Sequence, residues 1–122
     1  MDGRHLQRQA QIDAYGGGGF RFAGLSHRGS ILSLPDGIWA WPVAAAEALT
    51  EQSLSPVFAC TGALDFFILG TGLELWLAPE TLRGHFRQAQ ISFDAMTTAA
   101  AVRTYNVMLM EGRRLGAGLI AV

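Results

Sequence analysis

The second half of this chain alternates short apolar runs with amphipathic segments, and this alternation constrains the fold more than any other feature. LDFFILG (64–70), ISFDAM (91–96) and LGAGLIAV (115–122) are the apolar runs, and segments with helical spacing occupy 78–90 and 97–114. A short apolar run bounded by glycine is typical of a strand that is covered on both faces. The order strand, helix, strand, helix, strand predicts a mainly parallel sheet with right-handed crossovers.

The segment 97–114 has the spacing of an amphipathic helix of about four turns. We expect one continuous helix from Thr97 to about Gly112, in which Tyr105 and Leu109 face the core. The helix would then pack on the sheet through this apolar stripe.

The first half has a different pattern between residues 12 and 41, where apolar and polar residues alternate in short stretches such as FRFAG and IWAW. Glycine and proline turns separate these stretches, at GGGG (16–19) and PDG (35–37). The pattern predicts a meander of antiparallel strands. No helix start follows the glycine run, which favours a hairpin loop over a loop that contacts phosphate.

No internal repeat or linker divides the 122 residues, so we expect a single domain over residues 11–122. The first ten residues, MDGRHLQRQA, are polar and show no periodic apolar face, which predicts a flexible N-terminus over residues 1–10. Together the two halves predict an α/β domain that consists of a central sheet, helices and an N-terminal β-meander layer.

Composition excludes several classes of function. The net charge of −1 gives no electrostatic reason to expect nucleic-acid binding. The chain contains no lysine, which excludes Schiff-base chemistry and the phosphate-binding lysine of P-loop proteins. No apolar stretch reaches the ~18 residues that a membrane span requires, and the N-terminus carries no secretory signal. We therefore expect a cytoplasmic protein without a membrane span.

The common catalytic and metal-binding templates do not fit this sequence. The single cysteine, Cys60, has no base close to it in sequence, which indicates a buried, inert thiol in a reducing compartment. The three histidines are scattered, without the spacing of a zinc site. Asp65 and Asp94 lie in or beside predicted strands, and no neighbouring residue partners either one as a general base. We expect no cofactor, no metal and no catalytic residue.

One turn is nevertheless placed where ligands often bind. Gly70-Thr71-Gly72 ends the first predicted strand, and Thr98 opens the helix that follows the second. Ligands of open α/β sheets gather outside the carboxyl ends of the strands, so both would share one rim if the strands are neighbours. At least one glycine is expected to need a positive φ or an approach too close for a Cβ.

Arg103, near the start of the same helix, could donate to the carbonyls of this turn and hold the rim in shape. The Gly-Thr-Gly is too short for a dinucleotide-binding fingerprint, and a plain structural turn is the alternative. The full candidate rim consists of Gly70, Thr71, Gly72, Thr98, Arg103, Tyr105 and Asn106.

Three stretches carry a resemblance to a known family: FRFAGLSHRGSILSLPDGIWAW, ILGTG, and TTAAAVRTYNVMLMEGRRLGAGLIAV. From about Ile12 to the last residue, the chain resembles the small domain shared by a mitochondrial respiratory complex I assembly factor and many bacterial and archaeal proteins. The resemblance implies a three-layer α/β fold with a mixed central sheet. For the mitochondrial members it also implies an assembly role through protein contacts, without established catalysis. Nothing here resembles a mitochondrial transit peptide, so the chain looks like a bacterial member.

Two functional hypotheses follow. The first is a non-catalytic protein-interaction domain that assists assembly of respiratory complex I, with a respiratory complex subunit or assembly factor as its partner. The second is a small-ligand-binding protein or enzyme that uses the rim formed by the Gly70-Thr71-Gly72 turn and Arg103. An exposed apolar patch would favour the first, and a closed pocket enclosing Arg103 beside the turn would favour the second. We expect a monomer or weak homo-oligomer, and peripheral membrane association stays open.

Overall fold

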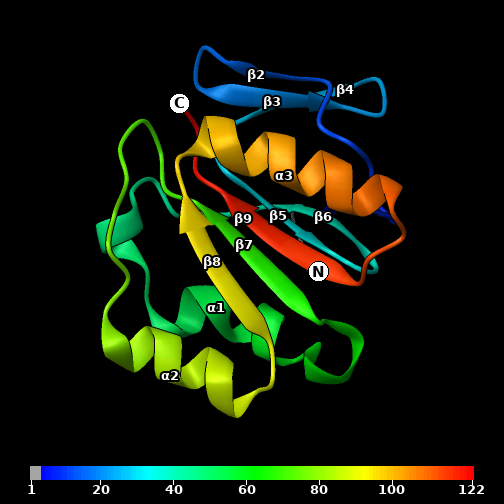
Figure 1. Ribbon diagram of the computed structural model, residues 1–122. Coiled ribbons are helices and arrows are strands. Elements are labelled where there is room, and N and C mark those ends of the chain that lie inside the picture. The colour runs from blue at the N-terminus through cyan, green and yellow to red at the C-terminus, as the bar shows by residue number, and fades with distance from the viewer. Residues whose placement is uncertain (1–3) are drawn as a thin grey trace.

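The structure, a computed structural model, describes residues 4–122 and contains a six-stranded and a three-stranded sheet with three α-helices (Figure 1). The strands are β1 (Arg4–Leu6), β2 (Ala14–Gly16), β3 (Gly19–Phe22), β4 (Leu25–Arg28), β5 (Ile31–Leu34), β6 (Gly37–Ala40), β7 (Phe66–Gly70), β8 (Ser92–Met96) and β9 (Leu115–Leu119). The helices are α1 (Glu51–Phe58), α2 (Glu80–Gln88) and α3 (Thr98–Met110), with short 3₁₀ turns η1 (Ala46–Ala48) and η2 (Thr61–Ala63).

The large sheet is mixed, in the order β1-β6-β5-β9-β7-β8. β7 pairs in parallel with both β9 and β8, as the strand–helix–strand pattern predicts. The first-half strands β1, β6 and β5 extend the sheet through antiparallel pairing, and β5 joins β9. The meander predicted over residues 12–41 is divided: β2, β3 and β4 form a separate antiparallel sheet, whereas β5 and β6 belong to the large sheet. The expectation of an α/β domain with a mixed central sheet and a β-meander layer is confirmed.

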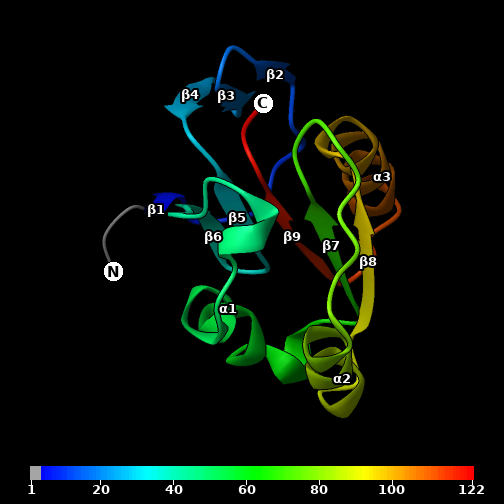
Figure 2. The same ribbon diagram turned by 90° about the vertical axis from the view of Figure 1, so that its left-hand side faces the viewer.

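The large sheet separates two cores. On one face α1 and α2 pack against Phe67 and Leu69 of β7, and on the other α3 and β3 pack around Ile68. Figure 2 shows α1 and α2 together at the bottom of the molecule, with α3 and the small sheet at the top. Residues 67–69 are all buried. The prediction that the apolar run LDFFILG contains a strand covered on both faces is therefore confirmed.

The last strand, β9, shows how the sequence serves both faces. Its leucines and Ala117 face α3, and its two glycines face the other core. A Cβ built on Gly118 would lie 2.5 Å from the Trp41 ring, and one on Gly116 would lie 3.0 Å from a Leu34 methyl. The alternation in LGAGL therefore leaves space on one face for Leu34 of β5 and for Trp41, which follows β6.

The helix α3 begins and ends close to the predicted positions. Thr97 caps it by accepting from the Ala100 amide, and Gly112 follows its end at φ 74°. Tyr105 is fully buried as expected, whereas Leu109 is only half-buried. The apolar stripe of this helix therefore contributes more to the core near its first half than near its last turn.

The glycine run forms the turn of the β2–β3 hairpin. Gly16, Gly17 and Gly18 all have positive φ, between 61° and 128°. This agrees with the hairpin interpretation of the sequence. The amide of Gly18 donates to the carbonyl of Val122, which ties the turn to the C-terminal segment.

The N-terminal segment differs from the flexible stretch expected over residues 1–10. β1 pairs with β6, and the Gln9 side chain donates to the carbonyl of Leu115 at 2.7 Å and to Ser33 Oγ at 3.2 Å. Hydrogen bonds hold residues 4–10 in place, and such bonds leave no apolar periodicity in the sequence. Residues 1–3 lie outside the described part of the chain.

Candidate functional site

The Gly70-Thr71-Gly72 turn joins four elements through its backbone. The amide of Thr71 donates to the carbonyl of Met96 at the end of β8, at 2.8 Å. The carbonyl of Gly72 accepts from the amide of Thr98 at the start of α3, at 2.9 Å, and the carbonyl of Gly70 accepts from Ile120 after β9, at 3.0 Å. The turn and the helix start do share one rim, as the sequence predicts.

The hydroxyl of Thr98 is the central polar group of this rim. Thr98 is fully buried, and its Oγ1 accepts from the amide of Gly72 at 2.9 Å and donates to the carbonyl of Ile120 at 2.8 Å. Thr71 Oγ1 donates to the carbonyl of Glu74 at 2.7 Å, with the Met96 carbonyl 3.1 Å away. Both hydroxyl protons serve internal bonds, so these threonines fasten the turn rather than face a ligand.

Both glycines of the turn meet the predicted requirement, each in its own way. Gly72 has φ +104°, a conformation that side chains other than glycine rarely adopt. A Cβ on Gly70 would lie 3.0 Å from Thr98 Oγ1 and 3.1 Å from the Ala101 and Leu119 side chains. Close packing of α3 onto the end of β7 therefore favours glycine at position 70, because a Cβ there would displace these side chains.

Arg103 does not join the rim. Its side chain is exposed, and no hydrogen bond from it to residues 70–72 is present within residues 4–122. It follows Thr98 by five residues, which is roughly 140° around the helix, so it points away from the turn. The structure therefore corrects the expectation that Arg103 holds the turn in shape.

Tyr105 and Asn106 bind the N-terminal segment instead of the rim. Tyr105 Oη donates to the carbonyl of Ala10 and lies 2.8 Å from Ser33 Oγ, while burial raises the pKa of its phenol to about 12. Asn106 accepts from the amide of Ile12 at 2.8 Å and donates to its carbonyl at 2.9 Å. Of the seven candidate residues, the three turn residues and Thr98 thus form the rim, and two side chains hold residues 10–12. The seventh, Arg103, is exposed and belongs to neither group.

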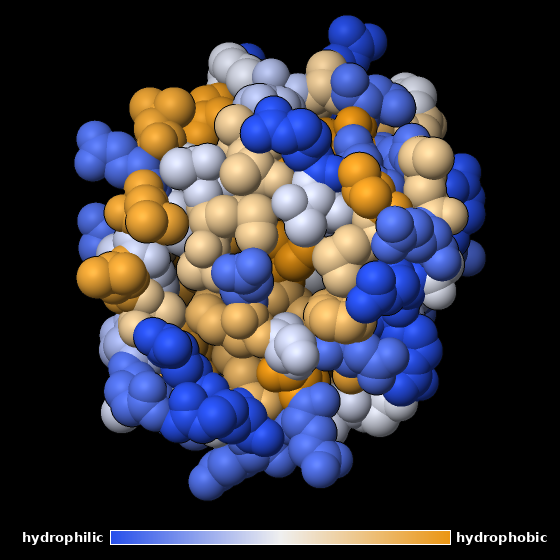
Figure 3. Space-filling view, viewed as in Figure 1, coloured by the Kyte–Doolittle hydropathy of each residue, from blue (hydrophilic) through white to orange (hydrophobic). Residues whose placement is uncertain are grey.

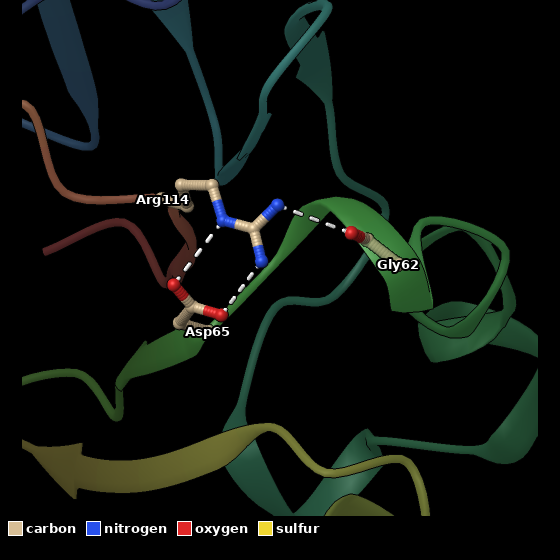
Figure 4. Close-up of polar contacts among 3 residues, drawn as sticks. All are labelled: Gly62, Asp65 and Arg114. Carbon is tan, nitrogen blue, oxygen red and sulfur yellow. Dashed lines mark hydrogen bonds and ion pairs between the residues drawn. The ribbon is translucent and has the colours of Figure 1, made fainter.

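Asp65, one of the two carboxylates weighed as a base, belongs to an ion pair (Figure 4). Arg114 approaches it with two nitrogens, Nη2 to Oδ1 at 2.9 Å and Nε to Oδ2 at 3.2 Å, and also donates to the carbonyl of Gly62. The hydrogen bonds and the charge of Arg114 lower the pKa of Asp65. A carboxylate with a lowered pKa is a weaker base, and this pair joins the starts of β7 and β9.

The loop after the turn carries a feature that the sequence analysis missed. Between β7 and α2, Leu73, Leu75 and Leu77 are 83%, 64% and 84% exposed, while Trp76 packs against the α1–α2 core. Figure 3 shows separate hydrophobic patches down the left edge, the side on which this loop lies in Figure 1. The alternation in LELWL was the available signal, but alternation does not say which side faces solvent.

Acidic side chains lie beside this leucine loop, defined as residues 73–77. A shallow groove of about 360 Å³ at its base is lined by Glu47 and Glu74 together with residues 120–122, and Arg103 is not among its lining residues. Next to the turn, the exposed leucines of the leucine loop thus form an apolar surface, with Glu47 and Glu74 at its edge. No helix within residues 4–122 is long and apolar enough to cross a membrane.

Comparison with other proteins shows how widely this fold and sequence are shared. A crystal structure described as an outer membrane protein from Bartonella henselae is 45% identical, covers 97% of this chain and 99% of its own, and superposes with a TM-score of 0.92. A protein from Rhodopseudomonas palustris is 50% identical over 97% of this chain and 87% of its own, with a TM-score of 0.86.

Sequence relatives include an uncharacterised protein of Rhodobacter capsulatus, 35% identical over 89% of this chain and 82% of the relative. The mouse and human NADH dehydrogenase [ubiquinone] 1 alpha subcomplex assembly factor 3 are 32% and 30% identical over 89% and 94% of this chain. This chain spans only 59% and 65% of those two mammalian proteins. The model of the family described as protein of unknown function (DUF498/DUF598) matches residues 12–120, and the chain belongs to that family.

Proposed function

We propose that this protein is a non-catalytic interaction domain that binds a partner protein through the leucine loop and assists assembly of respiratory complex I. The observation that carries the proposal is the exposure of Leu73, Leu75 and Leu77, at 83%, 64% and 84%, on one loop. Exposed apolar residues that cluster on a soluble domain commonly mark protein–protein contacts.

The loop has features that suit a binding surface. Trp76 packs against the core and Thr71 anchors the start of the loop through its hydroxyl, so the leucines project from a fastened segment. Full burial of one leucine side chain contributes about 1.5–3 kcal/mol, so three leucines can dominate a small interface. A pre-ordered loop also loses less conformational entropy on binding.

Charge indicates what the partner surface contains. Glu47 and Glu74 line the groove at the base of the loop, and no basic residue lines it within the described chain. A partner with an apolar patch edged by arginine or lysine would complement this surface. Because the negative groups lie at the edge, they would raise the association rate more than the affinity.

The relatives support a role in assembly. The mammalian proteins of similar sequence are assembly factors of NADH dehydrogenase, so we propose that the partner is a subunit of that complex or another of its assembly factors. We place this activity in the cytoplasm, with contact to membrane-bound partners from that side. The internal bonds of the rim's threonine hydroxyls, and the direction of Arg103 away from the turn, favour the interaction domain over a ligand site at the rim.

Affinity capture from the cells of origin tests this proposal. Leu73→Ser, Leu75→Ser and Leu77→Ser combined should reduce recovery of an NADH dehydrogenase subunit or assembly factor at least about tenfold. The matched control is Val107→Ser with Met110→Ser, since both are exposed apolar residues on α3, at 53% and 76%.

The controls separate the possible surfaces. The α3 variant should retain capture, and both variants should keep the parent melting temperature because none of the five residues is buried. Loss of capture in the α3 variant, with retention in the leucine variant, would move the surface to the outer face of α3. Arg103→Met should likewise retain capture. If no NADH dehydrogenase component is recovered with the parent protein, the assembly role is refuted.

A further inference from the structure

The largest hollow among those described lies between α1 and the β5–β6 hairpin, away from the leucine loop. Its volume is about 1030 Å³, at the upper end of the ~300–1,000 Å³ typical of small-molecule sites. In Figure 2, α1 lies below β5 and β6, and this part of the sheet face is not covered by α2. We call this hollow the α1 groove.

The walls of the α1 groove are mainly apolar. Leu32 and Leu34 of β5 with Trp39 and Trp41 form the sheet side, and Pro56 and Ala59 belong to the α1 side. Trp41 is held in place, because its Nε1 donates to the carbonyl of Ser53 in the first turn of α1 at 2.9 Å. The two indoles, together with the side chains of Pro56 and Ala59, would suit a flat or chain-like hydrocarbon body.

The two ends of the groove differ in electrostatics. Asp36, in the β5–β6 turn, and Cys60, just after the C-terminus of α1, lie at one end. Burial and, after it, the charge of Asp36 raise the pKa of the Cys60 thiol. The C-terminal end of a helix carries partial negative charge, which adds to that of Asp36. Thr50 and Ser53, at the start of α1, lie at the other end.

Charge decides the class of ligand. Asp36 is the sole charged residue among those that line the groove, and no ion pair to it is present within residues 4–122. Arg4 lies beside the lining, with its guanidinium 5.7 Å from the centroid of the Trp39 ring, so this indole already contacts a cation. Within the lining, a fatty acid or a phosphate-bearing cofactor would meet the Asp36 carboxylate, whereas Arg4 lies outside it.

We propose that the α1 groove binds a small organic cation with an apolar body, whose ammonium group lies at the Asp36 end. The body packs along the groove, with Trp39 on the sheet side and Pro56 and Ala59 on the α1 side, and the ammonium group pairs with the carboxylate at the mouth. This site is separate from the leucine loop, so its ligand would be bound independently of the proposed protein partner.

Three indole compounds of similar shape test the proposal: tryptamine is cationic, 3-ethylindole is neutral and indole-3-acetate is anionic. Binding is followed by amide NMR shifts and by protection of the single cysteine, Cys60, from alkylation by iodoacetamide. Tryptamine should bind up to about fivefold more tightly than 3-ethylindole, as expected for a partly exposed charge pair, and indole-3-acetate should bind most weakly. Saturating tryptamine should slow alkylation of Cys60.

Two variants and one control complete the experiment. Asp36→Asn should remove the preference for tryptamine over 3-ethylindole, while Glu51→Gln, on α1 but outside the lining, should preserve it. Ala59→Trp, at an exposed position of the lining, should weaken binding of all three compounds. Equal affinity for the three compounds, a preference that survives Asp36→Asn, or shifts confined to residues 73–77 would each overturn the proposal.

Discussion

Replacing Thr98 with valine removes one hydroxyl from the rim and keeps the shape of the side chain. In the structure that hydroxyl accepts from the Gly72 amide and donates to the Ile120 carbonyl, and Thr98 is fully buried. The substitution leaves both backbone groups without this partner in a site that excludes water. A buried polar group that loses its hydrogen bond costs about 1–3 kcal/mol, so we expect Thr98→Val to lower the free energy of unfolding by ~2–4 kcal/mol.

The melting temperature should fall accordingly. For a domain of this size 1 kcal/mol corresponds to roughly 3–4 °C, which predicts a decrease of about 6–16 °C in differential scanning calorimetry. Thr98→Ser keeps the hydroxyl and loses one methyl group, so its cost should stay near the ~0.8 kcal/mol of a buried CH₂ plus a small cavity term.

The comparison of these two variants tests the reasoning. Urea unfolding should give a lower midpoint for Thr98→Val than for Thr98→Ser, with equal m-values. A loss below about 1 kcal/mol for Thr98→Val would refute the conclusion that this hydroxyl fastens the turn to α3 and to the segment after β9. The rim would then be free to serve a ligand, and the role assigned to Thr98 would have to be revised.

Three further outcomes follow from the structure. Gly118→Ala places a Cβ 2.5 Å from the buried Trp41 ring and should lower the urea midpoint by an amount equivalent to ~1–3 kcal/mol or more. Asn106→Leu removes both hydrogen bonds to Ile12, so amide exchange over residues 4–12 should accelerate while the core of β7 stays protected. Burial and a neighbouring histidine lower the pKa of His27 below 6.5, so the folded state favours the neutral imidazole. The contribution of His27 to folding stability is therefore present above pH 6.5 and is lost as the pH falls through the folded-state pKa. Unfolding free energies at pH 7.5 and 5.5 should therefore differ less in His27→Gln than in the parent protein.

The sequence by itself determined those elements whose local residue pattern matches the burial that they have in the folded protein. The run 66–70 is apolar throughout because both faces of β7 are covered, and periodicity alone therefore identified it as a central strand. The caps and the apolar stripe of α3 are local features of the chain, so the bounds of this helix were predicted closely. The glycines of the turn at 70–72 were also predictable, because a sharp exit from a buried strand requires backbone freedom or a missing Cβ.

The tertiary structure alone decided which residues are ordered, buried or exposed where contacts join residues far apart in the chain. The polar segment 4–10 is ordered by bonds to β6, Ser33 and Leu115, which no local pattern encodes. Arg103 sits close in sequence to the rim residues of α3, yet the helical twist turns it to the opposite side. The leucines at 73, 75 and 77 look like core residues in the sequence, and they are exposed because Trp76 takes the inward position of that loop. Burial depends on which surface the rest of the chain presents to a residue, and that surface exists only after the sheet and helices have packed.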